Sequence, residues 1–307
     1  MASSQLPAWL QTSYNELMAQ AQRQQLAHAL LLQLSDGLGA HDLLKAIERG
    51  LMCRQVDAPC GHCKDCRLLQ ASSHPDCYWI AADGNQIKVD QIRELISALA
   101  TTSQQGGSRL VVIEQAHRLN NAAANALLKT LEEPNENCFI ILCSDTPGLL
   151  PATIISRCQR INVSGIDEAP IKHWLEQQGV DWQQHGWAYR IVGGPYALLD
   201  ANTGERLQGL ASARLAWRNA LANGIVDANL AKYTAEHPQD SLQVLDWLLS
   251  KKLASLKTQQ PLLSLKLGDF ISQLWHTHQK LSQMPTINYV ALCNRLVLEY
   301  KQLTKGN

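Results

Sequence analysis

The feature that most constrains the fold is a series of short apolar segments that alternate with helical patterns in the first half of the chain. The clearest of these segments are residues 29–33, 77–81, 110–113 and 139–142. Residues 160–163 extend the series as a fifth segment. Between them, apolar residues recur at three- and four-residue spacing, as in 89–99 and 120–133. Continuously apolar strands separated by helices are typical of a parallel sheet covered on both faces. We therefore predict an α/β domain over residues 1–163.

The rest of the chain carries helical patterns only. Residues 167–205 contain short helical stretches separated by glycines, and from about residue 207 the pattern is long and nearly free of glycine. We predict a small helical domain over 164–206 and a helical C-terminal domain over 207–307. Apolar pairs at helical spacing, such as Leu245/Leu249 and Leu296/Tyr300, pack either within their own domain or between chains, and the sequence leaves both alternatives open.

Composition argues against several classes of protein. In 307 residues, 27 Lys+Arg balance 27 Asp+Glu, whereas a dedicated nucleic-acid binder normally has a basic excess. The first residues lack the basic-then-apolar pattern of a signal peptide, and no stretch reaches the ~18–20 apolar residues that span a bilayer. We expect a cytoplasmic protein without membrane contacts, which would leave most contacts with any DNA to its partners.

Four of the nine cysteines lie close together, in the order Cys53, Cys60, Cys63 and Cys66. In a reducing compartment, such a group predicts a metal site, and four thiolates suit tetrahedral zinc. Gly61 eases the turn between ligands, and we expect His62 to point away. Since four thiolates leave no position for water, the zinc would be structural and not catalytic. Unliganded thiols in a loop are the alternative.

The segment after the first apolar run lies where a phosphate-binding loop would. A working loop has the pattern G-x-x-x-x-G-K-[ST], whose amides hold phosphates, whose lysine neutralises charge and whose hydroxyl binds magnesium. Gly37 and Gly39 remain here, but Leu34 stands in place of the first glycine. Ala40 stands in place of the lysine and His41 in place of the Ser/Thr. The neighbouring Asp36 adds a negative charge where phosphates would lie.

The second nucleotide motif is also altered. An apolar strand that should end in Asp-Glu is followed here by Glu114 and Gln115. Glu114 could contact a metal, but Gln115 cannot act as a base because a carboxamide has no useful proton affinity. Although a Gly-x-Gly turn alone fits a generic loop, the two altered motifs together predict no functional ATP site.

Two further segments carry a specific resemblance. They are Asn125-Ala-Leu-Leu-Lys-Thr-Leu-Glu-Glu-Pro134 and Leu150-Pro-Ala-Thr-Ile-Ile-Ser-Arg-Cys158. With the four-cysteine insertion and the altered phosphate loop, they resemble the clamp-loader branch of AAA+ proteins, over about residues 28–163. The resemblance implies an α/β plus all-α protein: a RecA-like AAA+ parallel-sheet domain with a zinc module, a small helical lid domain and a helical C-terminal collar domain for oligomerisation.

The resemblance also implies a function and partners. Members form a heteropentameric loader that opens a ring-shaped sliding clamp and places it on primed DNA in replication. The implied partners are gamma/tau-type ATPase subunits and the delta subunit of bacterial DNA polymerase III. In this family the arginine of Ser-Arg-Cys reaches a neighbour's ATP, which here is Arg157. The implied role is a non-hydrolysing stator that supplies an arginine finger in trans.

Two more positions follow from the resemblance. Ser144 falls where the family's polar sensor residue ends its strand. Tyr196 falls where active members carry a second sensor arginine, so another phosphate contact would be absent. Among the histidines, His28, His74 and His117 are expected to be packing or capping residues.

Alternatives remain at this stage. A weakly active AAA+ ATPase would hydrolyse ATP as an isolated chain, against which Ala40 and Gln115 argue. A zinc-containing nucleic-acid-binding module would bind DNA in a salt-sensitive way, which zero net charge disfavours. Locally, Arg157 could form a surface ion pair, and Lys129, Glu132 and Glu133 could form solvated pairs along their helix. The chain shows no carboxylate constellation for two-metal catalysis, so a nucleotidyltransferase label would belong to the assembly.

Overall fold

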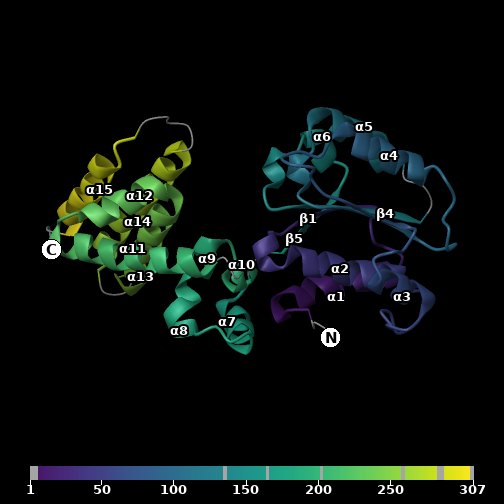
Figure 1. The fold of residues 1–307 in the computed structure, drawn as a ribbon, viewed down its shortest axis with the longest axis horizontal. Helices are drawn as coiled ribbons and strands as arrows, with labels where there is room; N and C mark the ends of the chain where they lie inside the picture. Colours follow the sequence, from purple (N-terminus) through teal and green to yellow (C-terminus); the bar gives the residue numbers. More distant parts are fainter. Residues whose placement is uncertain are drawn as a thin grey trace. The chain divides into compact units, whose positions relative to one another are not determined.

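The computed structural model describes residues 6–133, 137–163, 166–200, 203–256, 260–281 and 287–304. The chain divides into two compact units, residues 1–179 and 180–307 (Figure 1). The first unit holds the sheet and the second is helical. The finer division into domains over 1–163, 164–206 and 207–307 stays a prediction.

A five-stranded parallel sheet forms the centre of the first unit. Its order is β5-β1-β4-β3-β2, and every neighbouring pair is parallel. The strands are β1 (Ala29–Gln33), β2 (Cys77–Ile80), β3 (Arg109–Ile113), β4 (Cys138–Ser144) and β5 (Gln159–Asn162). The central strands β1, β3 and β4 are almost wholly buried, which explains their continuous apolar runs. The predicted α/β class is confirmed.

Helices cover both faces of this sheet. In Figure 1, α4, α5 and α6 lie on one side of the strands and α1, α2 and α3 on the other. The helices are α1 (Ala8–Gln22), α2 (Ala40–Met52), α3 (Lys64–Gln70), α4 (Val89–Leu99), α5 (Asn121–Glu132), α6 (Ala152–Ile155) and α7 (Glu168–Gln177). The predicted helix over 89–99 matches α4, and the one over 120–133 matches α5 within one residue at each end.

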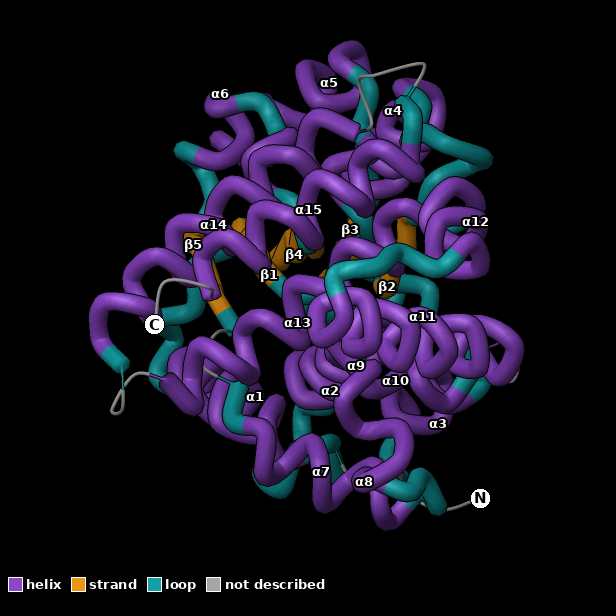
Figure 2. Tube along the Cα trace, turned by 90° about the vertical axis from the view of Figure 1, so that its left-hand side faces the viewer, coloured by secondary structure: helices purple, strands orange, loops and turns teal. Residues whose placement is uncertain are grey.

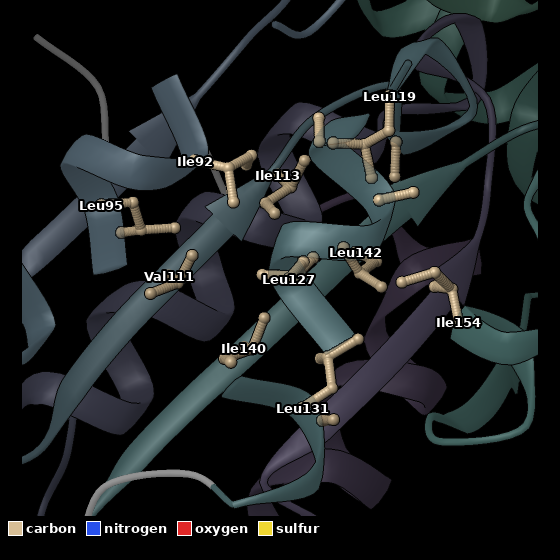
Figure 3. Close-up of a cluster of buried hydrophobic side chains, with 14 of the residues drawn as sticks. Ile92, Leu95, Val111, Ile113, Leu119, Leu127, Leu131, Ile140, Leu142 and Ile154 are labelled. Carbon is tan, nitrogen blue, oxygen red and sulfur yellow. The ribbon is translucent and has the colours of Figure 1, made fainter. Parts of the chain in front are cut away.

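The main core of this unit joins α4, α5 and α6 to β3 and β4 (Figure 3). Leu127 of α5 is fully buried among Val111 of β3, Ile140 of β4 and other apolar side chains of the same cluster. The helix begins at a cap in which Asn120 Oδ1 accepts the amide N–H of Ala123 at 2.8 Å. Its predicted stop, Pro134, lies outside the described residues. The packing of α5 in the core and the cap at its first turn together fix the position of its last turn, which carries Glu132.

The second unit consists of helices and turns. Short helices come first: α8 (Trp182–His185), the 3₁₀ turn η4 (Gly186–Ala188), α9 (Tyr189–Val192) and α10 (Pro195–Leu199). Long ones follow: α11 (Thr203–Asn223), α12 (Ala228–Glu236), α13 (Pro238–Leu256), α14 (Pro261–Leu281) and α15 (Tyr289–Thr304). Figure 2 shows them in purple, with the five strands in orange. The change from short to long helices was expected from the glycine pattern.

The core of the second unit decides between the two alternatives for its apolar faces. Leu245, Leu249, Leu296 and Tyr300 are all buried within the chain itself. These apolar faces therefore pack within their own unit, and the four side chains are not available for packing between chains. None of the described helices is long and apolar enough to cross a bilayer.

Candidate functional site

The residues of the two altered nucleotide motifs meet at the carboxyl edge of the sheet. β1 ends beside β4 with Gln33 paired to Ser144, and β3 ends beside β4 with Ile113 paired to Leu142. After β1 the chain makes a 3₁₀ turn, η1 (Asp36–Leu38), and enters α2 through Gly39. Gly39 has φ = 93°, a left-handed conformation that favours glycine. The loop, the start of α2 and the residues after β3 therefore lie together.

Side-chain bonds connect the two motifs across this edge. His41 Nδ1 lies 2.8 Å from Glu114 Oε1, and Gln115 Nε2 donates to Asp36 Oδ2 at 2.7 Å. The four residues are those predicted to stand in or beside the places of phosphate-binding and catalytic groups. Two of them are carboxylates, which repel an anion. The edge is thus cross-bonded by its own side chains, two of which are carboxylates.

The nearest lysine on α2 is engaged elsewhere. The phosphate-loop motif would carry its lysine at position 40, which is Ala40 here. Lys45 lies more than one helical turn further along. Its Nζ donates to Glu48 Oε2 at 3.0 Å and lies 3.8 Å from the centroid of the Trp79 ring. Trp79 Nε1 donates to the other oxygen of Glu48 at 2.5 Å. Lys45 therefore belongs to a local cluster with Glu48 and Trp79.

The two sensor positions differ in setting. Ser144 ends β4, is buried and lies 3.1 Å from His117 Nδ1, while its Oγ accepts the amide N–H of Thr146 at 3.1 Å. Its hydroxyl is therefore satisfied within the sheet edge. Tyr196 lies on α10 in the second unit, two residues after Gly194, which like Gly193 has a positive φ. His117 Nδ1 also lies 3.2 Å from Asp145 Oδ1, so this histidine has polar neighbours within the sheet edge.

Arg157 follows α6 and lies at the surface of the first unit. Its Nε donates to Glu132 Oε1 at 2.7 Å, its Nη2 contacts the same oxygen, and its Nη1 donates to the carbonyl of Thr153 at 2.9 Å. The side chain is 33% exposed and that of Glu132 is 47% exposed. The surface ion pair that was considered an alternative is therefore present. Glu132 forms it with Arg157, an arginine outside its own helix.

The four clustered cysteines converge as a metal site requires. Their Sγ atoms all lie within 4.8 Å of one another, with Cys53–Cys63 at 4.0 Å and Cys60–Cys66 at 3.9 Å. Four sulfurs at ~2.3 Å from a tetrahedral zinc ion would be about 3.8 Å apart. Gly61 has φ = 76°, which allows the tight turn between ligands. The geometry therefore fits one tetrahedral ion.

The surroundings of the sulfurs favour thiolates unequally. Hydrogen bonding, led by the backbone N–H of His62, lowers the pKa of the Cys60 thiol to about 6. Burial raises the pKa of Cys66 to about 12. A bound divalent cation would favour the thiolate form of both. His62 itself is exposed, with Nδ1 at 2.8 Å from the carbonyl of Cys60, so it points away from the sulfurs as expected.

Ion pairs attach this module to the sheet unit. Asp65 of α3 is buried, accepts from Arg54 Nε at 3.1 Å and lies 3.5 Å from Nε2 of the buried His74. His74 Nδ1 in turn accepts the amide N–H of Asp76 at 3.2 Å, just before β2. The cysteine module thus lies beside the segment that leads into the edge strand, with Asp65 Oδ1 and His74 Nε2 close together but not hydrogen-bonded. The sequence did not predict these contacts, because the residues that form them lie on separate elements.

The strand order and the loop–helix unit after β1 define the first unit as a AAA+-like α/β module. The family model described as "DNA polymerase III, delta subunit" matches residues 9–167, just over half of the chain. The chain belongs to the family of DNA polymerase III delta prime subunits.

Individual relatives agree with this assignment. The DNA polymerase III subunit delta' of Haemophilus influenzae is 41% identical over 172 residues, which cover 55% of this chain and 53% of that protein. The Yersinia pestis delta' subunit is 38% identical over 267 residues, 82% of this chain and 76% of that protein. The first alignment thus spans about half of its relative. A solved DNA polymerase III gamma subunit-related protein from Thermotoga maritima has a TM-score of 0.47 and 17% identity, covering 96% of this chain and 99% of that one. A likeness at that level carries no information about function.

Proposed function

We propose that this chain is the non-hydrolysing member of a clamp loader and supplies Arg157 in trans to the ATP of a neighbouring ATPase subunit. The observation that carries the proposal is the contrast between two sites. At the carboxyl edge of the sheet, the loop after β1 has no lysine, and side chains of this loop and of the start of α2 are bonded to those that follow β3. Arg157, by contrast, presents a partly exposed guanidinium at the surface.

The absence of hydrolysis is supported by the chemistry of the edge. Phosphoryl transfer depends on cations and amides that stabilise charge on the transferred group. Ala40 offers no charge, and Asp36 and Glu114 add negative charge. Gln115 is held by Asp36 at 2.7 Å and cannot accept a proton from water. ATP at this edge would meet repulsion and no base.

The role of Arg157 is supported by its position and its charge. It lies in the Ser-Arg-Cys segment at 156–158, and its side chain is 33% exposed although its guanidinium donates to Glu132 and to the carbonyl of Thr153. A guanidinium stays charged and presents a planar fork of donors to phosphate oxygens. An arginine supplied in trans contributes roughly 10³–10⁵ in rate to phosphoryl transfer. Exchanging one carboxylate for a phosphate is then the step that activates the neighbour.

The partners and the metal belong to the same proposal. The neighbouring ATPase would be a gamma/tau-type subunit, with the delta subunit, the sliding clamp and primed DNA reached through the assembly. Residues 164–206 would serve as a small lid domain and 207–307 as the collar that joins the subunits. Cys53, Cys60, Cys63 and Cys66 would hold one structural zinc ion, which supplies cross-linking of the module and no reaction step.

Two measurements test the proposal. The isolated chain should show no ATP turnover and little ATP binding by calorimetry, and turnover by the isolated chain would support the rival ATPase hypothesis. In a loader assembled with its ATPase subunits, Arg157→Ala should lower the ATPase rate without changing assembly in gel filtration. The exposed Arg160, three residues away, offers the matched control Arg160→Ala. Equal rates for Arg157→Ala and Arg160→Ala would remove Arg157 from the mechanism.

A further inference from the structure

The second unit carries a patch of tryptophans and cations that no role described above uses. We call it the tryptophan–cation patch, and its members are Trp187, Arg214, Arg218, Trp247 and Lys251. They come from η4, α11 and α13, and α11 and α13 pack directly against each other (Figure 1). Both tryptophans are partly exposed, and Arg218 and Lys251 are exposed. Residues about 60 positions apart thus form one surface feature.

Two of the cations lie over the faces of the indole rings, which are tilted against each other. The centroids of Trp187 and Trp247 lie 5.4 Å apart at an interplanar angle of 55°. The guanidinium carbon of Arg214 lies 4.5 Å from the Trp187 centroid and 5.7 Å from that of Trp247. Lys251 Nζ lies 5.8 Å from the Trp247 centroid. Cation–π contacts at these distances hold the charged groups in fixed places beside the indoles.

No carboxylate among the described residues forms an ion pair with the three cations of the patch. Some other cations of the same unit are paired with carboxylates, for example Arg206 with Asp240 at 2.7 Å and Arg295 with Glu299 at 3.6 Å. Burial lowers the pKa of Arg214, and the positive charge of Arg218 lowers it further. The two arginines of the patch therefore repel each other. The patch is therefore a local excess of positive charge in a chain whose formal net charge is zero.

We propose that the tryptophan–cation patch binds single-stranded nucleic acid. Its three cations can neutralise successive phosphodiesters, and the adjacent indoles offer aromatic surface on which bases stack, the combination that single-strand binding sites share. An acidic peptide would satisfy the cations but would not use two neighbouring indoles. The patch belongs to the second unit, so this binding uses neither Arg157 nor the cysteine module.

The test is fluorescence anisotropy of a labelled oligothymidylate of about 15 nucleotides with the full-length chain at low salt. Three cationic contacts should give a log–log salt slope of about −2, since each contributes about −0.7 for single strands. Arg214→Gln/Lys251→Gln should weaken binding about tenfold or more and reduce the slope to about −0.7. Trp247→Leu should weaken binding about tenfold while leaving the slope unchanged.

The matched control removes the same two kinds of charge elsewhere in the unit. Lys232→Gln/Arg295→Gln should bind as the unchanged chain does, because these cations are exposed and lie in helical i,i+4 pairs. Circular dichroism and melting curves check that each variant folds. Equal affinities for the patch variant and this control would overturn the proposal. So would absence of oligonucleotide binding by the unchanged chain, or binding of polyglutamate in its place.

Discussion

Glu132 offers a sharp test of how Arg157 acts, because it is the group that the guanidinium must leave. In the isolated chain, Nε and Nη2 of Arg157 both contact Glu132 Oε1, while Nη1 is held by the carbonyl of Thr153. To reach a neighbour's phosphate, Arg157 has to give up the carboxylate. Glu132→Gln removes the competing charge and leaves a side chain of the same size.

The magnitude follows from the exposure of the pair. The side chain of Arg157 is 33% exposed and that of Glu132 is 47% exposed, so screening limits the pair to roughly 0.5–1 kcal/mol despite its charge-assisted hydrogen bonds. Since 1.4 kcal/mol corresponds to a factor of ten, releasing Arg157 should raise kcat/KM for ATP by about twofold to fivefold. The melting temperature of the chain should fall by no more than about 4 °C.

The assay is steady-state ATP hydrolysis by the assembled loader with four variants of this subunit. These are Glu132→Gln, Arg157→Ala, the double variant and the neighbouring exposed control Glu133→Gln. Because Glu132 acts only through Arg157, the double variant should match Arg157→Ala alone. The reasoning is refuted if Glu132→Gln lowers the rate as far as Arg157→Ala does, or if it raises the rate when Arg157 is absent.

Three further outcomes follow from the structure. Cys66→Ser, or treatment with a strong chelator, should remove about one equivalent of zinc measured by elemental analysis and lower the melting temperature of the chain; unchanged zinc content in the variant would rule out Cys66 as a ligand. Leu127→Ala should cost about 3 kcal/mol in urea unfolding, because it deletes a fully buried side chain from the core of the first unit, and a loss below about 1 kcal/mol would contradict that packing. Burial raises the pKa of Asp76, but hydrogen bonds from the amides of Gln104 and Gln105 and from Ser103 outweigh it, so the pKa is lowered. The stability that Asp76 contributes should therefore be complete above its unfolded pKa of about 3.9 and be lost as the pH falls through the lower, folded pKa. The difference in unfolding free energy between Asp76→Asn and the unchanged chain should vanish at low pH.

The strands at the centre of the sheet were predictable because their burial is uniform. Residues 110–113 and 139–142 are apolar throughout, since β3 and β4 are covered on both faces. The edge strand β5 was placed one residue late, at 160–163, because Gln159–Asn162 is largely exposed and carries no apolar run. Pattern alone therefore locates central strands well and edge strands less well.

Sequence motifs single out the residues at this edge of the sheet, but they do not predict how those residues pair. Asp36, His41, Glu114 and Gln115 were identified from motifs, and parallel strands explain why they share an edge. The bonds His41–Glu114 and Asp36–Gln115 span 73 and 79 positions, and no local pattern specifies which side chains meet at such separations. The same holds for Glu132, which lies in a recognised motif but pairs with an arginine 25 residues further along.

The central claim is that this chain gives one cation to a reaction whose nucleotide is held by a neighbour. A structure of the assembled loader trapped with ADP and aluminium fluoride tests it most directly. The account expects the guanidinium of Arg157 at about 2.7–2.9 Å from the fluoride group in the adjacent subunit, released from Glu132, with no nucleotide against residues 34–41 of this chain. A nucleotide seated at 34–41, or Arg157 still bonded to Glu132 beside a complete neighbouring transition-state analogue, would contradict it.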